Sequence, residues 1–229
     1  MRNRYIGFKL WKWRGKKREN QKRSTLDALR KLRSFIYLRE RGNHGYTLLF
    51  TTCNYTPCSS SLVCYYSLLS ADSNKKTLLI DANLHRSNIH NLLGCDNDIG
   101  LTNVLLGDST VEHAIRNIPG TNLDVMTSGP ITDSPSDLMY RHFNTIVKAI
   151  SQSYDHIIID SPPLIEVSDT QSIAAIADGV VLVLNARHTK KKQAEVAREI
   201  LDSINATVLG MIYNDEELPA GDYSKNKGY

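Results

Sequence analysis

The segment DHIIID (residues 155–160), followed by Ser161-Pro162-Pro163, decides the fold class of this chain. A second segment, TLLID (residues 77–81), has the same form: a short apolar run that ends in aspartate. Runs that are apolar throughout are typical of strands buried on both faces of a parallel sheet. Because ligands bind at the carboxyl ends of such strands, we expect Asp81 and Asp160 to lie near one crevice.

Outward from these two segments, apolar runs alternate with helical patterns. The predicted strands cover residues 46–52, 77–81, 122–126, 155–160, 178–184 and 207–213. The predicted helices between them cover residues 59–71, 101–117, 135–151, 168–176 and 190–204. This alternation predicts one three-layer α/β domain over residues 44–214, with a mostly parallel central sheet flanked by helices.

The composition excludes several other classes of protein. Hydrophobic residues make up 41% of the 229 residues and charged residues 23%, which is ordinary for a globular chain and excludes a fibrous one. No apolar run reaches the length of a membrane span and no signal-peptide pattern opens the sequence, so we expect a cytosolic protein. The four cysteines and seven histidines show no spacing typical of a zinc site or a disulfide framework.

Charge is distributed unevenly along the chain. Residues 1–41 contain 15 Lys and Arg against three Asp and Glu, whereas the remainder contains 13 against 21. Within residues 1–23 the cations are interleaved with aromatic residues, among them Trp11 and Trp13, a combination that suits an anionic membrane surface. The alternatives are a solvated tail that folds back onto the body, and a site for single-stranded nucleic acid.

The basic arm is followed by a predicted helix over residues 24–41, with Ser24 as its N-cap. Asp27, Arg30 and Arg33 follow one another at three-residue steps and therefore share one face of this helix. The predicted parts of the chain are an arm (1–23), a helix with linker (24–43), the α/β domain (44–214) and a polar tail (215–229).

A strand that ends in aspartate is the usual form of a Walker B element, whose carboxylate holds Mg²⁺ directly or through water. A nucleotide site also needs a phosphate-binding loop of the pattern GxxxxGK[ST] between the first strand and the next helix. The sequence at that place is TTCNYTPCSSS (residues 51–61), which has no glycine and no lysine. The N-terminus of the helix at 59–71 still offers backbone N–H groups to an anion.

Further segments occur in a specific order along the chain. They are Asp27-x-x-Arg30-x-x-Arg33, LIDANLHR (79–86), GLTNVLLG (100–107), SGP (128–130), SPSDL (134–138), YDHIIIDSPP (154–163), SD (168–169), ADGV (177–180) and LGMIYN (209–214). On these segments, from about residue 24 to its end, the chain resembles the bacterial tyrosine kinases of capsule and exopolysaccharide synthesis, of the CpsD, CapB and Wzc cytoplasmic-domain type.

This resemblance implies a P-loop NTPase-type fold, autophosphorylation on tyrosine with ATP and Mg²⁺, and a role for individual residues. Asp81 and Asp160 match the catalytic and magnesium-binding acids, and Ser60 matches the magnesium-binding hydroxyl. The remaining nucleotide-binding positions are Thr56, Cys58, Ser59, Ser61 and Asn214. Asp27, Arg30 and Arg33 match an oligomerisation motif, and Tyr223 and Tyr229 match a tail of phosphorylated tyrosines.

The chain departs from the family in the phosphate-binding loop. Thr56 and Cys58 stand where the family has glycines, which allow the backbone to approach phosphate closely, and Ser59 stands where it has lysine. Losing one such charged contact typically costs roughly 3 kcal/mol of transition-state stabilisation. Asn83 also replaces the second aspartate of the LIDAD motif.

We therefore expect a degenerate kinase (a pseudokinase) that regulates capsule or exopolysaccharide synthesis. The family uses ATP and Mg²⁺, whereas the expectation for this chain is either that it holds neither group or that it binds nucleotide weakly, with Mg²⁺ held by Asp81, Asp160 and Ser60. The expected partners are a transmembrane chain-length or activator protein, further copies or an active relative, and the inner face of the cell membrane through residues 1–23. Nucleic acid is not favoured. The alternatives are an active autokinase with a non-standard loop, and a membrane- or nucleic-acid-binding module led by the arm.

Overall fold

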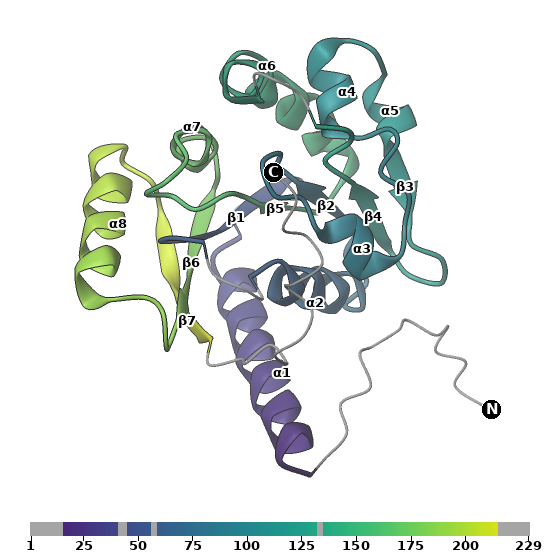
Figure 1. The fold of residues 1–229 in the computed structure, drawn as a ribbon. Helices are drawn as coiled ribbons and strands as arrows, with labels where there is room; N and C mark the ends of the chain where they lie inside the picture. The colour runs from purple at the N-terminus through teal and green to yellow at the C-terminus, as the bar shows by residue number, and fades with distance from the viewer. Residues whose placement is uncertain (1–15, 41–44, 56–58, 132–134, 215–229) are drawn as a thin grey trace, which may run out of the picture.

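The computed structural model describes residues 16–40, 45–55, 59–131 and 135–214, and only the backbone of residues 16–25 and 135. Within these residues, seven strands form one sheet in the order β3-β4-β2-β5-β1-β6-β7. Neighbouring strands are parallel except β3 and β4, which are antiparallel. Helices cover both faces of the sheet (Figure 1), so the predicted three-layer α/β fold is confirmed.

The observed elements follow the predicted alternation closely. The strands are β1 (Tyr46–Thr52), β2 (Thr77–Asp81), β3 (Ile115–Asn117), β4 (Leu123–Met126), β5 (His156–Asp160), β6 (Gly179–Asn185) and β7 (Val208–Asn214). The helices are α1 (Lys16–Tyr37), α2 (Ser59–Ala71), α3 (Ile89–Leu93), α4 (Leu101–Leu106), α5 (Val111–Ala114), α6 (Pro135–Ile150), the 3₁₀ turn η1 (Ser151–Ser153), α7 (Asp169–Ala174) and α8 (Lys191–Ser203).

Three stretches differ from the prediction, and one of them is the short helix α3, which the sequence pattern did not indicate. Helix α1 begins at Lys16, so Ser24 lies inside the helix and is not its N-cap. The segment from Lys16 to Tyr37 contains no glycine or proline that would stop a helix earlier. The single helix predicted over residues 101–117 is instead α4, α5 and β3, because Gly107 adopts a left-handed conformation with φ of 79° and ends α4.

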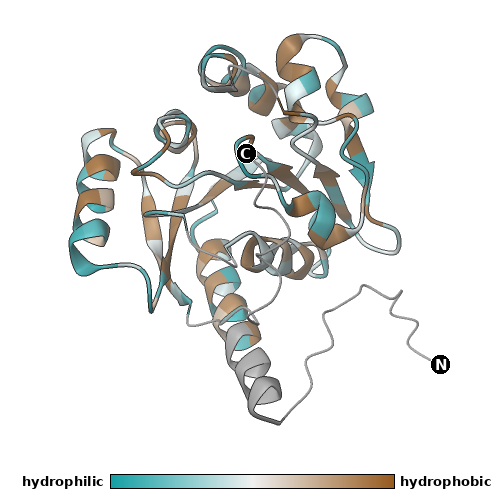
Figure 2. Cartoon of the chain, viewed as in Figure 1, coloured by the Kyte–Doolittle hydropathy of each residue, from teal (hydrophilic) through white to brown (hydrophobic). Residues whose placement is uncertain are grey.

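Apolar side chains alternate between the two faces of the sheet, and Figure 2 shows the strands as largely hydrophobic. Leu48 and Ile158 belong to the core under α1, α2 and α3. Leu49 and Ile157, their neighbours in sequence, belong to the core under α4, α6, α7 and α8. This burial on both faces explains why the strands are apolar throughout.

Helix α1 packs against the body through its C-terminal half. Leu29 and Ile36 are buried in the same core as α2, and Arg33 donates a hydrogen bond of 2.8 Å to the carbonyl oxygen of Leu69 in α2. The N-terminal turns of α1 extend beyond the other elements (Figure 1). None of the helices within the described residues has the length and apolar character needed to cross a membrane.

Gly100 and Gly129 lie where the start of α4 packs closely against the loop that follows β4. A Cβ atom added to Gly100 would lie 2.3 Å from the backbone nitrogen of Gly129 and from the carbonyl oxygen of Thr127. Gly129 adopts a φ of +78°, which disfavours any residue with a side chain. The glycines therefore let α4 begin directly against the loop that follows β4.

Candidate functional site

Two aspartates end neighbouring strands at the carboxyl edge of the sheet. Asp81 is the last residue of β2, Asp160 is the last residue of β5, and the two are register partners. The backbone N–H of Ala82 donates a hydrogen bond of 2.8 Å to the carbonyl oxygen of Asp160, which fixes the two strand ends together. Both side chains are buried: Asp81 is 0% exposed and Asp160 is 2% exposed.

The hydrogen bonds of the two carboxylates differ. The oxygens of Asp81 accept from the backbone N–H groups of Asn83 and Ile89, each at 3.2 Å. The carboxylate of Asp160 accepts from the hydroxyl of Ser60, in the first turn of α2. Within the described residues, Oδ2 of Asp160 has no hydrogen-bond partner. An unpaired buried oxygen beside a second acid is costly unless a proton or a cation compensates it.

Burial is the main influence on the acidity of the pair. Burial raises the pKa of Asp160 to about 7, although the hydrogen bond from Ser60 lowers it in part. Burial and the charge of Asp160 raise the pKa of Asp81 well above its usual range, although backbone hydrogen bonds oppose them. In the part of the chain that the structure describes, no Lys or Arg is among these influences.

The serines of the degenerate loop lie at the start of α2. Ser59, Ser60 and Ser61 form its first turn, and all three are half-buried. Thr56 and Cys58, the positions matched to glycines, lie outside the described residues. The structure therefore brings Ser60 to the acidic pair and leaves the rest of the loop to be judged from its sequence.

A second polar group, which the sequence did not single out, borders the end of β1. Nε2 of His85 lies 3.2 Å from Oδ2 of Asp169, a side chain that is almost fully buried. The guanidinium of Arg86 lies 4.1 Å from the centre of the Tyr55 ring, and Glu166 accepts a hydrogen bond from the backbone N–H of Tyr55. The segments LIDANLHR and SD contained three of these residues, but only the fold shows that they meet.

Other predicted residues lie away from the acidic pair. Asn214 ends β7, three strand positions from Asp160, or roughly 14 Å at the usual spacing of strands. Asp27 and Arg30 form an ion pair of 3.2 Å on α1, with side chains 64% and 58% exposed. Arg33 instead points at the C-terminal end of α2. Tyr223 and Tyr229 lie outside the described residues.

The acidic pair has the donor set of a magnesium site. Mg²⁺ prefers carboxylate, hydroxyl and water oxygens, and Asp81, Asp160 and Ser60 supply the first two kinds. The unpaired Oδ2 of Asp160 is the atom that such an ion would satisfy. No group of three or more His, Cys, Asp or Glu side chains that could hold a metal occurs among the described residues, so any ion here depends on the hydroxyl and on water.

Comparison with known proteins gives matches both in sequence and in structure. Residues 59–208 match the protein family described as an AAA domain. The chain is 37% identical to the tyrosine-protein kinase YwqD of Bacillus subtilis over 66% of its own length and 65% of that relative, so it spans slightly less than two thirds of YwqD. It is 30% identical to CapB of Staphylococcus aureus over 86% of each chain. The solved kinase domain of the Escherichia coli tyrosine kinase ETK superposes with a TM-score of 0.78 at 25% identity, over 89% of this chain and 80% of that one.

Proposed function

Because the chain belongs to the bacterial tyrosine kinase family, we propose that it is a degenerate member that regulates capsule or exopolysaccharide synthesis rather than an independent kinase. Kinases of this family draw phosphate from ATP with Mg²⁺. The observation that carries the proposal is the loop TTCNYTPCSSS, which provides no glycine and no lysine to the phosphates.

The physical argument concerns charge and backbone shape. Phosphoryl transfer relies on positioning and on neutralising the phosphate oxygens, and the loop lysine is a main source of that positive charge. Ser59 occupies the lysine position, and Pro57 removes one backbone N–H from the loop. The acidic pair has no Lys or Arg influence among the described residues to replace that charge. The residues present thus fit a Mg²⁺ ion but not the triphosphate that would accompany it.

The acidic pair itself supports the alternative, an active kinase with a non-standard loop. Ser60 donates to Asp160, as a magnesium-binding hydroxyl beside a Walker B carboxylate should. When bound, Mg²⁺ would neutralise phosphate charge; Asp81 and Asp160 would hold it, directly or through water, and Ser60 would orient Asp160. An active kinase of this kind would have to bind the phosphates of ATP through backbone N–H groups alone, because the loop has no lysine.

We extend the proposal to partners. Asp27 and Arg30, exposed on α1, are available to a neighbouring copy or to an active relative. The basic and aromatic residues 1–23 suit the anionic inner face of the cell membrane. At that surface the chain would bind a transmembrane chain-length or activator protein. Tyr223 and Tyr229 would then be substrates of an active partner rather than of this chain.

Autophosphorylation tests the proposal directly. The purified chain is incubated with Mg²⁺ and ATP beside a repaired chain that carries Thr56→Gly, Cys58→Gly and Ser59→Lys, and phosphotyrosine is located by mass spectrometry. We expect phosphate on Tyr223 or Tyr229 only in the repaired chain, and its loss when Asp160→Ala is added. Phosphotyrosine on the natural chain that Asp160→Ala abolishes would favour the active kinase instead.

A further inference from the structure

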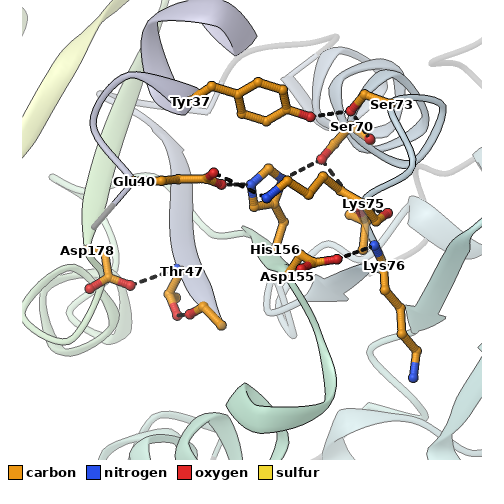
Figure 3. Close-up of polar contacts among 12 residues, drawn as sticks. Tyr37, Glu40, Thr47, Ser70, Ser73, Lys75, Lys76, Asp155, His156 and Asp178 are labelled. Atoms are coloured by element: carbon orange, nitrogen blue, oxygen red, sulfur yellow. Dashed lines mark hydrogen bonds and ion pairs between the residues drawn. The ribbon is translucent and has the colours of Figure 1, made fainter. Parts of the chain in front are cut away.

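A buried polar cluster surrounds His156 (Figure 3), at the opposite end of β5 from Asp160. His156, the first residue of β5, is 0% exposed, and its register partner is Thr77, the first residue of β2. The same two strands end at Asp160 and Asp81. The cluster is therefore separate from the candidate site, although both use β2 and β5.

Both ring nitrogens of His156 have partners from other elements. Nδ1 lies 2.6 Å from the hydroxyl oxygen of Ser70 in α2. Nε2 contacts Oε1 of Glu40, which follows α1, and Oε2 of Glu40 accepts a hydrogen bond of 3.3 Å from Lys75. Figure 3 shows the imidazole between these two partners. The histidine thus joins the segment after α1 to α2 through the start of β5.

One protonation state satisfies every group of this cluster. A neutral imidazole has one donor and one acceptor nitrogen. If Ser70 donates its hydroxyl proton to Nδ1, the N–H at Nε2 points at the carboxylate of Glu40. The negative charge of Glu40 is balanced by Lys75. The cluster therefore buries no unpaired charge, and burial followed by the charge of Lys75 keeps the histidine neutral by lowering its pKa to about 4.

The last turn of α1 closes over the same histidine. The ring centres of Tyr37 and His156 lie 5.6 Å apart, and the hydroxyl of Tyr37 hydrogen-bonds to that of Ser73. The ammonium of Lys75 lies 5.5 Å from the Tyr37 ring. Tyr37, the last residue of α1, and Glu40, three residues beyond it, thus both contact His156.

The cluster adds hydrogen bonds of fixed geometry to the apolar contacts that hold α1 against the body. Leu29 and Ile36 attach the helix through apolar contacts, which are non-directional and permit rotation or sliding. Hydrogen bonds to a fixed imidazole have narrow geometric limits. Arg33 supplies one directional contact in the middle of the helix, and Glu40 supplies a second beyond its end.

We propose that Glu40, His156 and Ser70 form a latch that fixes the end of α1 against the start of β5. Two points of directional attachment set the rotation of α1, and with it the direction in which the exposed Asp27 and Arg30 face. The latch stands on its own contacts, whereas its consequence for assembly rests on the proposed function, in which α1 meets a neighbouring subunit.

Hydrogen exchange of the full chain tests the latch. The change is Glu40→Ala, and the matched control is Asp27→Ala, which removes an exposed paired acid of α1; both variants are compared with wild type at a concentration at which the chain is monomeric. We expect the amides of residues 26–37 to exchange roughly tenfold faster or more in Glu40→Ala, since a hydrogen bond to a charged group is lost. The control should stay within about twofold, because exposed ion pairs contribute little.

Glu40→Gln keeps an acceptor for Nε2 and should exchange at an intermediate rate. Exchange of β1 amides reports whether the body stays folded, and in Glu40→Ala it should not change. Unchanged exchange of α1 in Glu40→Ala would overturn the latch, as would equal acceleration in the Asp27→Ala control.

Assembly is measured separately by sedimentation velocity. With the latch and the proposed function both correct, Arg30→Glu abolishes self-association and Glu40→Ala weakens it. If Arg30→Glu has no effect, the proposed role of α1 in assembly fails, and the exchange result still decides the latch.

Discussion

Asp160→Asn should stabilise the metal-free protein at alkaline pH, although it alters the residue that best marks the candidate site. Asp160 is buried beside Asp81 and has one carboxylate oxygen without a partner in the described structure. Asparagine has nearly the same shape, can still accept from Ser60, and removes one of two buried charges that repel each other. A gain in stability on replacing Asp160 would show that the two buried carboxylates destabilise the metal-free fold. Such a cost is expected where residues serve a ligand and not the fold.

The magnitude follows from the raised pKa. The pKa of the Asp160 carboxyl moves from 3.8 to about 7 on folding. A raised carboxyl pKa gives stability that is complete below the unfolded value and is lost as pH rises through the folded value. Between pH 5 and pH 7 this loss amounts to about 2–3 kcal/mol, at about 1.4 kcal/mol per unit. The free energy of unfolding of Asp160→Asn, relative to wild type, should therefore rise by about 2–3 kcal/mol from pH 5 to pH 8.

The assay is urea unfolding followed by circular dichroism, in EDTA, on both chains at both pH values. Titration of His156 affects both chains equally and cancels in the difference. Addition of Mg²⁺ at pH 8 should then stabilise wild type and leave Asp160→Asn unchanged. A stability difference that does not change between pH 5 and pH 8, or a variant less stable than wild type at pH 8 in EDTA, would contradict a raised pKa of Asp160 in the folded protein.

Three further predictions concern packing, protonation and the arm. Gly100→Ala should lower the free energy of unfolding by about 2–3 kcal/mol in urea titrations, because its Cβ meets backbone atoms at 2.3 Å, whereas Gly210→Ala, with open space around it, should be nearly neutral. His156 should titrate near pH 4 by nuclear magnetic resonance, and the stability it contributes should be lost as pH falls from about 6.5 towards 4; a midpoint above 6 would contradict its burial. Deletion of residues 1–23 should abolish binding to anionic vesicles, whereas single-stranded oligonucleotides should bind neither the full chain nor the deletion variant; unaltered vesicle binding would exclude the arm as the membrane contact.

The strands and their order along the chain could be predicted because their signal is local. The runs DHIIID and TLLID are apolar at every position, and the structure buries both faces of β5 and β2. The helix predicted over residues 101–117 was wrong because one residue, Gly107, ends α4 in a left-handed conformation that periodicity does not reveal. Helix α1 starts eight residues before its predicted N-cap because Ser24 is tolerated inside a long run of good helix formers.

The acidic pair was predictable because each aspartate ends its own strand. The protonation of the pair could not be predicted. The pKa values of both acids are raised by burial, and Oδ2 of Asp160 lacks a partner, only because β2 and β5 lie side by side in the fold. The contacts of His85 with Asp169 and of Glu40 with His156 join residues 84 and 116 positions apart in sequence. No spacing rule applies over such separations, so these contacts required the fold.

We propose that this kinase fold has kept its acidic pair and lost its phosphate-binding loop. Isothermal titration calorimetry of ATP and ADP with Mg²⁺ tests it most directly, on the natural chain and on the chain repaired by Thr56→Gly, Cys58→Gly and Ser59→Lys. We expect measurable nucleotide binding by the repaired chain and none by the natural one. Binding of either nucleotide by the natural chain at micromolar concentration would contradict this proposal and favour the alternative of an active kinase with a non-standard loop.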